Sequence, residues 1–310
     1  MPTLAVCMPN FNQARLIKRA IEAVLKQTRL PDEFFIIDDH SSDESAGVIE
    51  SYVRKNPWIV FLRHTANKGV ASIFEEAVIL SKSDYIYGGA SDDYVFPHFF
   101  EKAIEWAGRF PSAGIVFGKM VVVDPAGKRL TTLQARSWQT PGFISPQDYM
   151  SGYLERESPM HSLCGATLYR KDFIQGMGIG RFQDLGHWYD SFVARTLALR
   201  HGACYLAQEA SAWSVLPGSM TQSAIRKKAD MVHIVERAAH YMRSGEFKSI
   251  YPEAYVEKWR RGYLKAVDFI CRPWAIGAAE AAMKLAPYPF IGVLARVFEK
   301  ELRVRILNRF

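Results

Sequence analysis

Four short apolar segments alternate with amphipathic segments over the first 93 residues, and this alternation constrains the fold more than any other feature. The apolar segments have the length and composition of buried strands, and they are residues 4–8, 34–37, 59–62 and 85–87. Between them, apolar residues recur at helical spacing, as at Ile17, Ala20, Ile21, Val24 and Leu25. Strands that alternate with helices in this order predict right-handed crossovers and a mostly parallel sheet flanked by helices. We therefore expect an α/β fold of the Rossmann type.

Polar residues follow three of these apolar segments closely. They are Pro9 and Asn10, Asp38 and Asp39, and Asp92 and Asp93. Ligands of open α/β sheets bind beyond the carboxyl ends of the strands. We therefore expect the three pairs to converge on one edge of the sheet and to form a binding site there.

The pattern changes after Pro111, where shorter apolar segments and turn signals replace the regular alternation. These segments are residues 115–117, 120–123, 166–169 and 203–206. The turn signal at residues 124–127 predicts that the added strands are partly antiparallel. A helix is expected over residues 190–200, ended by Gly202.

The sequence predicts helices from residue 223 to near its end, so we place a domain boundary near residue 220. Residues 221–310 carry 17 Lys and Arg against 9 Asp and Glu, whereas residues 1–220 carry 22 against 23. A near-neutral sheet domain followed by a basic helical region predicts that the helical region faces an anionic surface. Membrane phospholipid fits this charge as well as nucleic acid does, but the acidic strand ends argue against a nucleic-acid partner.

The cysteines and the N-terminal residues bear on localisation. Cys7, Cys164, Cys204 and Cys271 lie far apart and form no CxxC pair, so we expect reduced thiols. The N-terminal residues lack the basic and apolar regions of a signal peptide, and no run of about 18 apolar residues predicts a membrane span. These features predict a cytoplasmic protein, and the charge of its basic region would also allow contact with the inner face of the membrane.

The two acidic pairs suit a nucleotide with its cation. Mg²⁺ and Mn²⁺ are hard cations that bind carboxylate oxygens, such as those of Asp92 and Asp93, together with phosphate oxygens and water. The carboxylates of Asp38 and Asp39 can accept a hydrogen bond from a pyrimidine N–H or from ribose hydroxyls. For one pair alone, a turn or a helix cap would be the better explanation. Two pairs, each after a buried strand, favour a shared site.

The sequence around these residues resembles the family 2 glycosyltransferases with the GT-A fold. The resemblance rests on Met8-Pro-Asn-Phe-Asn-Gln13, Ile36-Ile-Asp-Asp-His-Ser-Ser-Asp43, Asn67-Lys-Gly69 and Ala90-Ser-Asp-Asp93, and it covers roughly residues 3–220. It implies an inverting transfer of a sugar from a nucleotide sugar, often UDP-linked, with Mg²⁺ or Mn²⁺. A hydroxyl of a saccharide or lipid-linked acceptor would receive the sugar, in the synthesis of a surface polysaccharide or glycolipid.

The resemblance also implies roles on the donor side of the site. Pro9 and Asn10 would shape the nucleotide pocket. Asp39, with Asp38 beside it, would contact uracil or the ribose.

On the metal side, the resemblance implies that Asp92 binds the cation and that Asp93 supports it. Ala90 stands where the family usually has the first aspartate of the acidic motif, so the protein would supply fewer metal ligands. The arginine often found after the Asn-x-Gly segment is also absent, and residues 73–76 (Ile-Phe-Glu-Glu) stand in that region. Phosphate contacts from that region are therefore not expected.

The family usually carries its general base as the aspartate of a Glu-Asp pair before a helix. Asp190, ahead of the helix that ends at Gly202, is the nearest match, although Tyr189 replaces the glutamate. Asp184 is the alternative base, and a helix N-cap is the alternative role for Asp190.

Two alternatives concern the protein as a whole, and three concern its basic helical region. It would be a non-catalytic subunit that binds nucleotide sugars if the departures from the acidic motifs abolish chemistry. A sugar-nucleotide pyrophosphorylase would need a Gly-rich phosphate loop after the first strand, which residues 9–12 do not offer. The basic helical region would contact a membrane, pack on the sheet domain or form a homodimer.

Overall fold

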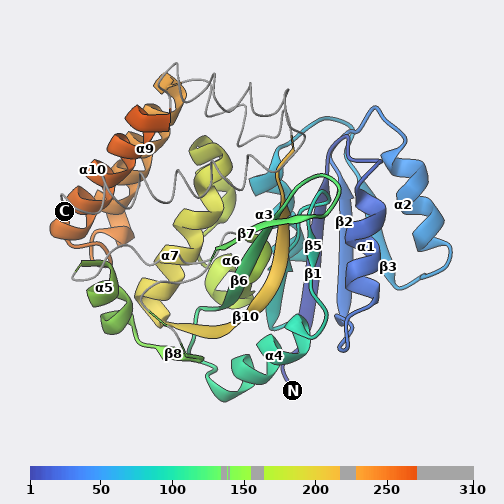
Figure 1. Ribbon diagram of the computed structural model, residues 1–310, viewed down its shortest axis with the longest axis horizontal. Coiled ribbons are helices and arrows are strands. Elements are labelled where there is room, and N and C mark those ends of the chain that lie inside the picture. The colour runs from blue at the N-terminus through green and yellow to red at the C-terminus, as the bar shows by residue number, and fades with distance from the viewer. Residues whose placement is uncertain (134–137, 139, 155–163, 217–227, 271–310) are drawn as a thin grey trace.

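The computed structural model describes residues 1–133, 138, 140–154, 164–216 and 228–270. These residues form one mixed sheet with helices on both faces (Figure 1). The strands are β1 (Leu4–Asn10), β2 (Glu33–Asp38), β3 (Ile59–Arg63), β4 (Tyr85–Gly88), β5 (Tyr94–Val95), β6 (Ile115–Val123), β7 (Arg129–Leu133), β8 (Gly142–Ile144), β9 (Thr167–Arg170) and β10 (Ala203–Ser214). The α-helices are α1 (Ile17–Leu25), α2 (Ser45–Val53), α3 (Val70–Leu80), α4 (Phe99–Arg109), α5 (Pro146–Leu154), α6 (Lys171–Gln175), α7 (Tyr189–His201), α9 (Lys228–Arg243) and α10 (Glu253–Ile270). The 3₁₀ segments are η1 (Cys164–Ala166), η2 (Ile179–Trp188) and η3 (Gly245–Phe247).

The sheet confirms the predicted α/β class and adds antiparallel strands to it. Its order is β3-β2-β1-β4-β9-β6-β10-β5, with β7 beside β6 and β8 beside β10. The strands β3, β2, β1 and β4 are parallel, as the alternating pattern predicts. Strand β9 runs antiparallel to both β4 and β6, so β6 and its parallel neighbour β10 point the same way as β1. We call the edge at which β1, β2, β4, β6 and β10 end the carboxyl edge.

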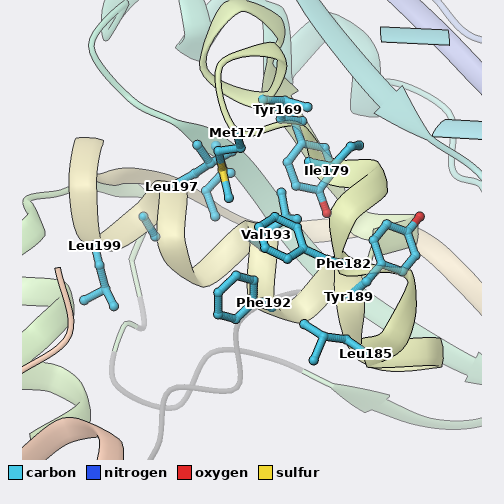
Figure 2. Close-up of a cluster of buried hydrophobic side chains, with 14 of the residues drawn as sticks. Tyr169, Met177, Ile179, Phe182, Leu185, Tyr189, Phe192, Val193, Leu197 and Leu199 are labelled. Atoms are coloured by element: carbon cyan, nitrogen blue, oxygen red, sulfur yellow. The ribbon is translucent and has the colours of Figure 1, made fainter. Parts of the chain in front are cut away.

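Side chains alternate between two hydrophobic cores, one on each face of the sheet. In β1, Ala5 and Cys7 face the core built with α3, α6 and α7, whereas Val6 and Met8 face the core built with α1, α2 and α4. Figure 2 shows part of the first core, where aromatic and aliphatic side chains of η2 and α7 pack together. Because successive strand residues point to opposite faces, a sheet with both faces covered needs the continuous apolar runs seen in the sequence.

Helix α7 begins at the carboxyl edge and ends at the opposite edge. It is 13 residues long, which corresponds to about 20 Å, and Gly202, with a φ of 82°, ends it directly before β10. Because β10 runs toward the carboxyl edge, the helix that leads into it must run the other way. Figure 1 shows this antiparallel arrangement of α7 and β10. The first turn of α7, with Asp190, therefore lies toward the carboxyl edge.

Helices α9 and α10 share the core of α7 (Figure 1). The rings of Phe182 and Phe192 contact Tyr241 of α9 at centroid distances of 5.2 and 6.0 Å, and Trp259 of α10 is completely buried. The packing explains the apolar spacing of these two helices. The domain boundary near residue 220 remains a prediction, and the helices expected beyond residue 270 lie outside the described residues.

Two further expectations concern cysteines and the membrane. Cys7 and Cys204 are buried free thiols, and burial raises the pKa of Cys204 to about 12. Among the described residues, no helix is long and apolar enough to cross a membrane.

Candidate functional site

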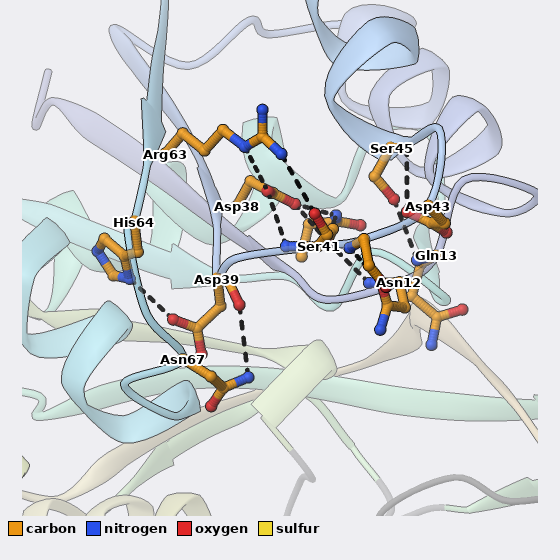
Figure 3. Close-up of polar contacts among 12 residues, drawn as sticks. Asn12, Gln13, Asp38, Asp39, Ser41, Asp43, Ser45, Arg63, His64 and Asn67 are labelled. Atoms are coloured by element: carbon orange, nitrogen blue, oxygen red, sulfur yellow. Dashed lines mark hydrogen bonds and ion pairs between the residues drawn. The ribbon is translucent and has the colours of Figure 1, made fainter.

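The carboxyl edge brings the loops after β1 and β2 into direct contact (Figure 3). The side-chain amide of Asn10 donates to the Asp38 carboxylate over 2.7 Å, and the backbone N–H of Asp39 donates to the Asn10 carbonyl over 2.8 Å. On the other side of β1, the Gly89 N–H donates to the Cys7 carbonyl over 2.9 Å, so the turn between β4 and β5 begins at the same edge. Since neighbouring strands lie about 4.8 Å apart, the ends of β2 and β4 are roughly 10 Å apart across β1.

Pro9 lies just beyond the point where the pairing of β1 with β4 ends. Odd-numbered residues of β1 direct their backbone groups toward β4 and even-numbered ones toward β2, as the bonds to the Cys7 and Asn10 carbonyls show. The pairing of β1 with β4 ends at Cys7 and Gly88, so the nitrogen of Pro9, which carries no hydrogen, faces a position that β4 does not reach. A proline is tolerated in an inner strand only where no ladder bond is needed.

Asp38 holds the loops after β1 and β2 together. Its carboxylate is fully buried and accepts from Asn10 Nδ2, from the Ser41 N–H over 3.1 Å and from the Ser41 hydroxyl over 2.5 Å. The guanidinium Nε of Arg63 lies 3.5 Å from the same carboxylate. By contrast, the buried Oδ1 of Asn10 accepts no hydrogen bond from the described part of the chain. A buried acceptor without a donor is destabilising, and a bound ligand would relieve it.

The carboxylate of Asp39, which follows β2, is held by the backbone directly before α3. The carboxylate is 2% exposed and accepts from the N–H groups of Lys68 and Gly69, each over 2.8 Å, and His64 Nδ1 lies 2.8 Å from its Oδ1 (Figure 3). Burial alone would raise the pKa of Asp39, but the Lys68 N–H, the His64 ring and the Gly69 N–H together lower it. The carboxylate is therefore held in its charged form.

Phe11 is a residue that the sequence reasoning missed. Its side chain is 49% exposed and directly follows β1 at the carboxyl edge. An exposed aromatic ring beside polar acceptors suits stacking against a nucleobase. In the sequence, Phe11 is an aromatic residue inside an otherwise polar loop. Single exposed aromatic residues are common on protein surfaces, so this pattern alone does not predict a nucleotide contact.

The turn after β4 carries the second acidic pair. The Asp93 N–H donates to the Ala90 carbonyl over 3.2 Å, and the Asp93 carboxylate accepts from the Ser214 N–H at the end of β10 over 2.7 Å. Burial raises the pKa of Asp92, and burial together with the neighbouring Asp92 charge raises the pKa of Asp93 well above its usual range. The turn therefore holds two half-buried carboxylates whose charge is disfavoured in the absence of a cation.

Arg19 of α1 braces this turn and was also missed. Its guanidinium donates to the Asp92 carbonyl over 2.9 Å and to the Ser214 hydroxyl over 2.8 Å, and it lies 4.6 Å from the centre of the Tyr94 ring. Its partners are 73 and 195 residues away along the chain. Only the tertiary fold brings them together, so no local sequence signal exists.

The two candidate bases lie in different surroundings. Asp190 is in the first turn of α7, whose N-cap is Trp188, so the N-cap role considered for Asp190 is wrong. The Asp190 carboxylate accepts from the Ser191 N–H over 2.5 Å. Asp184 is instead tied to α9, because it pairs with the Arg237 guanidinium and accepts from the Tyr241 hydroxyl over 3.1 Å.

The structure also shows what replaces the missing arginine of α3. Phe74 is buried in the core against Tyr169, with ring centroids 5.8 Å apart. Glu75 accepts from the Gly180 N–H over 3.0 Å and so attaches α3 to η2, which leads into α7. This part of α3 holds the segment before Asp190.

Comparison with known proteins agrees with this geometry. Residues 5–176, more than half of the chain, match the family described as Glycosyl transferase family 2. The chondroitin synthase of Escherichia coli is 30% identical over 105 residues, which is 34% of this chain and 15% of that protein. The chain thus spans only a small share of this relative.

Two solved structures have a similar fold. S. aureus TarS 1–349 in complex with UDP-GlcNAc gives a TM-score of 0.63 at 16% identity, over 84% of this chain and 71% of that chain. The mannosyltransferase PcManGT from Pyrobaculum calidifontis, in complex with GDP-Man and Mn²⁺, gives a TM-score of 0.59 at 17% identity, over 97% of this chain and 81% of that chain. At these identities the likeness shows the fold alone.

The mixed sheet with helices on both faces has the GT-A fold, like the two solved structures. The chain belongs to glycosyl transferase family 2. This membership confirms the family predicted from the sequence and favours the transferase over the pyrophosphorylase alternative.

Proposed function

We propose that the protein is an inverting glycosyltransferase that moves a sugar from a UDP-linked donor to a hydroxyl of a saccharide or lipid-linked acceptor. The product would belong to a surface polysaccharide or glycolipid. One observation carries this proposal: the acidic end of β2 and the acidic turn after β4 flank β1 at the same edge, toward which α7 presents Asp190. An inverting displacement needs a leaving-group site and a base, and this edge offers residues for both.

The donor nucleotide is assigned to the ends of β1 and β2. Asn10 Oδ1 is a buried acceptor in need of a donor, and the Asp39 carboxylate is charged and keeps acceptor capacity beyond its three protein contacts. Both suit the N–H of a pyrimidine or the hydroxyls of ribose, and Phe11 would stack on the base. Pro9 would keep β4 away from this place, and Asp38 would brace the loops. TarS was solved with UDP-GlcNAc and PcManGT with GDP-Man, and their similar fold supports a nucleotide-sugar donor.

The acidic turn is assigned to a divalent cation, Mg²⁺ or Mn²⁺. Within the described residues, no group of three or more His, Cys, Asp or Glu side chains could hold a metal ion. We assign the cation to Asp92, supported by Asp93, because Mg²⁺ commonly binds through one or two carboxylates together with substrate phosphates and water. The raised pKa values of both carboxylates fit a place that gains from a cation. When bound, the cation would neutralise charge on the leaving diphosphate.

Asp190 is assigned as the general base that takes the proton from the acceptor hydroxyl. It lies in the first turn of a helix that begins at the carboxyl edge, and it is partly exposed. Asp184 is engaged by Arg237 and Tyr241, so its carboxylate serves the packing of η2 against α9. Because Asp190 lies in the first turn of the helix that begins at the carboxyl edge, we prefer it to Asp184.

A membrane contact through the basic helical region remains a proposal. In α9 and α10, Arg237, Arg243 and Arg260 each pair with a glutamate or aspartate. These helices therefore present less free positive charge than their composition indicates. Residues 271–310, outside the described residues, carry 7 Lys and Arg against 3 Asp and Glu. Binding of the full-length chain and of a chain ended at residue 270 to anionic vesicles would test this contact, and analytical ultracentrifugation would test a homodimer.

The central test measures UDP release from a panel of UDP-sugars with Mn²⁺ and saccharide acceptors. The wild type should release UDP, Asp92→Asn should not, and the control Asp172→Asn should match the wild type, because exposed Asp172 lies at the opposite edge of the sheet. Equal release by wild type and Asp92→Asn would contradict the assignment of the cation. Nucleotide binding without release in any donor and acceptor combination would favour the non-catalytic subunit.

A further inference from the structure

His64 forms a bridge between two carboxylates beside the proposed nucleotide site. It follows β3, and its side chain is 5% exposed. Its Nδ1 lies 2.8 Å from Asp39 Oδ1, and its Nε2 lies 2.9 Å from Glu76 Oε2 on α3. Figure 3 shows the His64 ring directed at Asp39. The ring thus joins the ends of β2 and β3 to a helix that covers the sheet.

Both ring nitrogens of His64 lie within hydrogen-bond distance of a carboxylate oxygen. A neutral imidazole has one donor and one acceptor nitrogen, so one of its nitrogens would direct a lone pair at a carboxylate. The doubly protonated ring donates to both carboxylates. The charged groups around the ring are Asp39, which directly follows β2, and Glu76 of α3, with the Lys68 ammonium 3.6 Å from Glu76. Arg63, adjacent in the chain, pairs with Asp38 instead.

The His64 bridge contacts Asp39, the residue that is assigned to the donor nucleotide. Asp39 Oδ1 takes both the Lys68 N–H and the His64 ring, whereas Oδ2 takes only the Gly69 N–H among the described residues. A carboxylate oxygen accepts about two hydrogen bonds, so Oδ2 keeps capacity for a ligand. Without the ring, the carboxylate would keep the Lys68 and Gly69 N–H groups but would lose its contact on the side of β3, so the direction of this capacity would be fixed less tightly.

We propose that His64, held by Glu76, is a positioning residue that fixes the Asp39 carboxylate for binding of the donor nucleotide. The inference rests on the proposed function, because it takes Asp39 as a nucleotide contact. It assigns His64 no contact with substrate. A positioning role predicts weaker nucleotide binding in folded variants, with kcat for bound donor unchanged. A purely structural role predicts lower stability with unchanged nucleotide affinity.

Three substitutions separate the two ends of the bridge. His64→Asn places an amide near the position of Nδ1 and keeps a donor to Asp39. His64→Gln places its amide near Nε2, on the side of Glu76, and His64→Leu removes both. The matched control is His233→Asn, an exposed histidine of α9.

Isothermal titration with UDP and, in parallel, GDP in MnCl₂ gives the dissociation constants, and circular dichroism checks the fold of each variant. His64→Gln and His64→Leu should raise the Kd about tenfold, which corresponds to about 1.4 kcal/mol and to one lost charge-assisted hydrogen bond. His64→Asn and the control should keep the wild-type Kd. The donor KM should follow the Kd, with kcat unchanged.

The results overturn the inference if folded His64→Leu binds as tightly as the wild type, or if His64→Asn binds as weakly as His64→Gln. If His64→Leu does not fold, the Kd values of His64→Asn and His64→Gln alone test the inference. Failure of the proposed function looks different: the wild type then binds neither UDP nor GDP, and this inference falls with it.

Discussion

Replacement of Asp190 by asparagine separates the two aspartates considered as the general base. Asparagine keeps the size of the side chain and can still accept the Ser191 N–H, but it cannot take a proton from the acceptor. A positioned base contributes about 10²- to 10⁴-fold to a rate, so kcat of Asp190→Asn should fall by about that factor. The loss corresponds to about 2.7–5.5 kcal/mol in the activation barrier. Donor affinity should stay unchanged, because Asp190 lies on α7 and the nucleotide residues lie at and directly after the ends of β1 and β2.

Asp184→Asn is the matched comparison. The change removes the ion pair with Arg237 but keeps an oxygen that can accept from Tyr241. The paired side chains are 34% and 43% exposed, so solvent screening keeps the loss of stability small. We expect a small fall in Tm and an unchanged kcat.

Single-turnover kinetics with saturating donor, together with UDP titration, measure the rate and the affinity separately. The reasoning is refuted if Asp190→Asn keeps the wild-type kcat, or if Asp184→Asn loses as much rate as Asp190→Asn while remaining folded.

Three further predictions concern the donor side, the cation and stability. Phe11→Ala should weaken UDP binding by about 1–3 kcal/mol, the usual contribution of base stacking, without a loss of Tm, because the side chain is 49% exposed; an unchanged Kd would contradict this. Asp92→Asn should raise Tm without divalent cations, because it removes a charge that burial disfavours, and Mn²⁺ should raise Tm of the wild type only; an equal rise in both proteins would contradict the assignment. The lowered folded-state pKa of Asp39 means that its stabilising contribution is present above about pH 4 and is lost as the pH falls further. Urea unfolding of Asp39→Asn should therefore depend less on pH below about pH 4 than the wild type does, and parallel curves would argue against this.

The parallel half of the sheet could be predicted from the sequence because each of its strands carries its own local signal. The run at residues 34–37 is apolar because both faces of β2 are covered, and Asp38 stops the run where the strand leaves the core. The position of Asn10 beside Asp38 then follows from parallel register alone. The acidic pairs therefore meet at one edge for reasons that hold for any sheet of this type.

The rest depends on tertiary contacts that leave no local pattern. The two apolar segments expected at residues 115–117 and 120–123 form the single strand β6, because Gly118 between them lies against the backbone of β10 and continues the strand. Arg19 and His64 act on partners from other elements. Packing of α9 and α10 on α7 depends on which helix face meets which core, and periodicity alone does not specify this.

The most direct test of the shared site is a crystal structure with UDP and Mn²⁺, using the anomalous signal of manganese to place the cation. We predict one manganese peak beside Asp92, between this carboxylate and the diphosphate, with the uracil against Asn10, Asp39 and Phe11. Manganese remote from Asp92, or a nucleotide bound away from the ends of β1 and β2, would contradict the account.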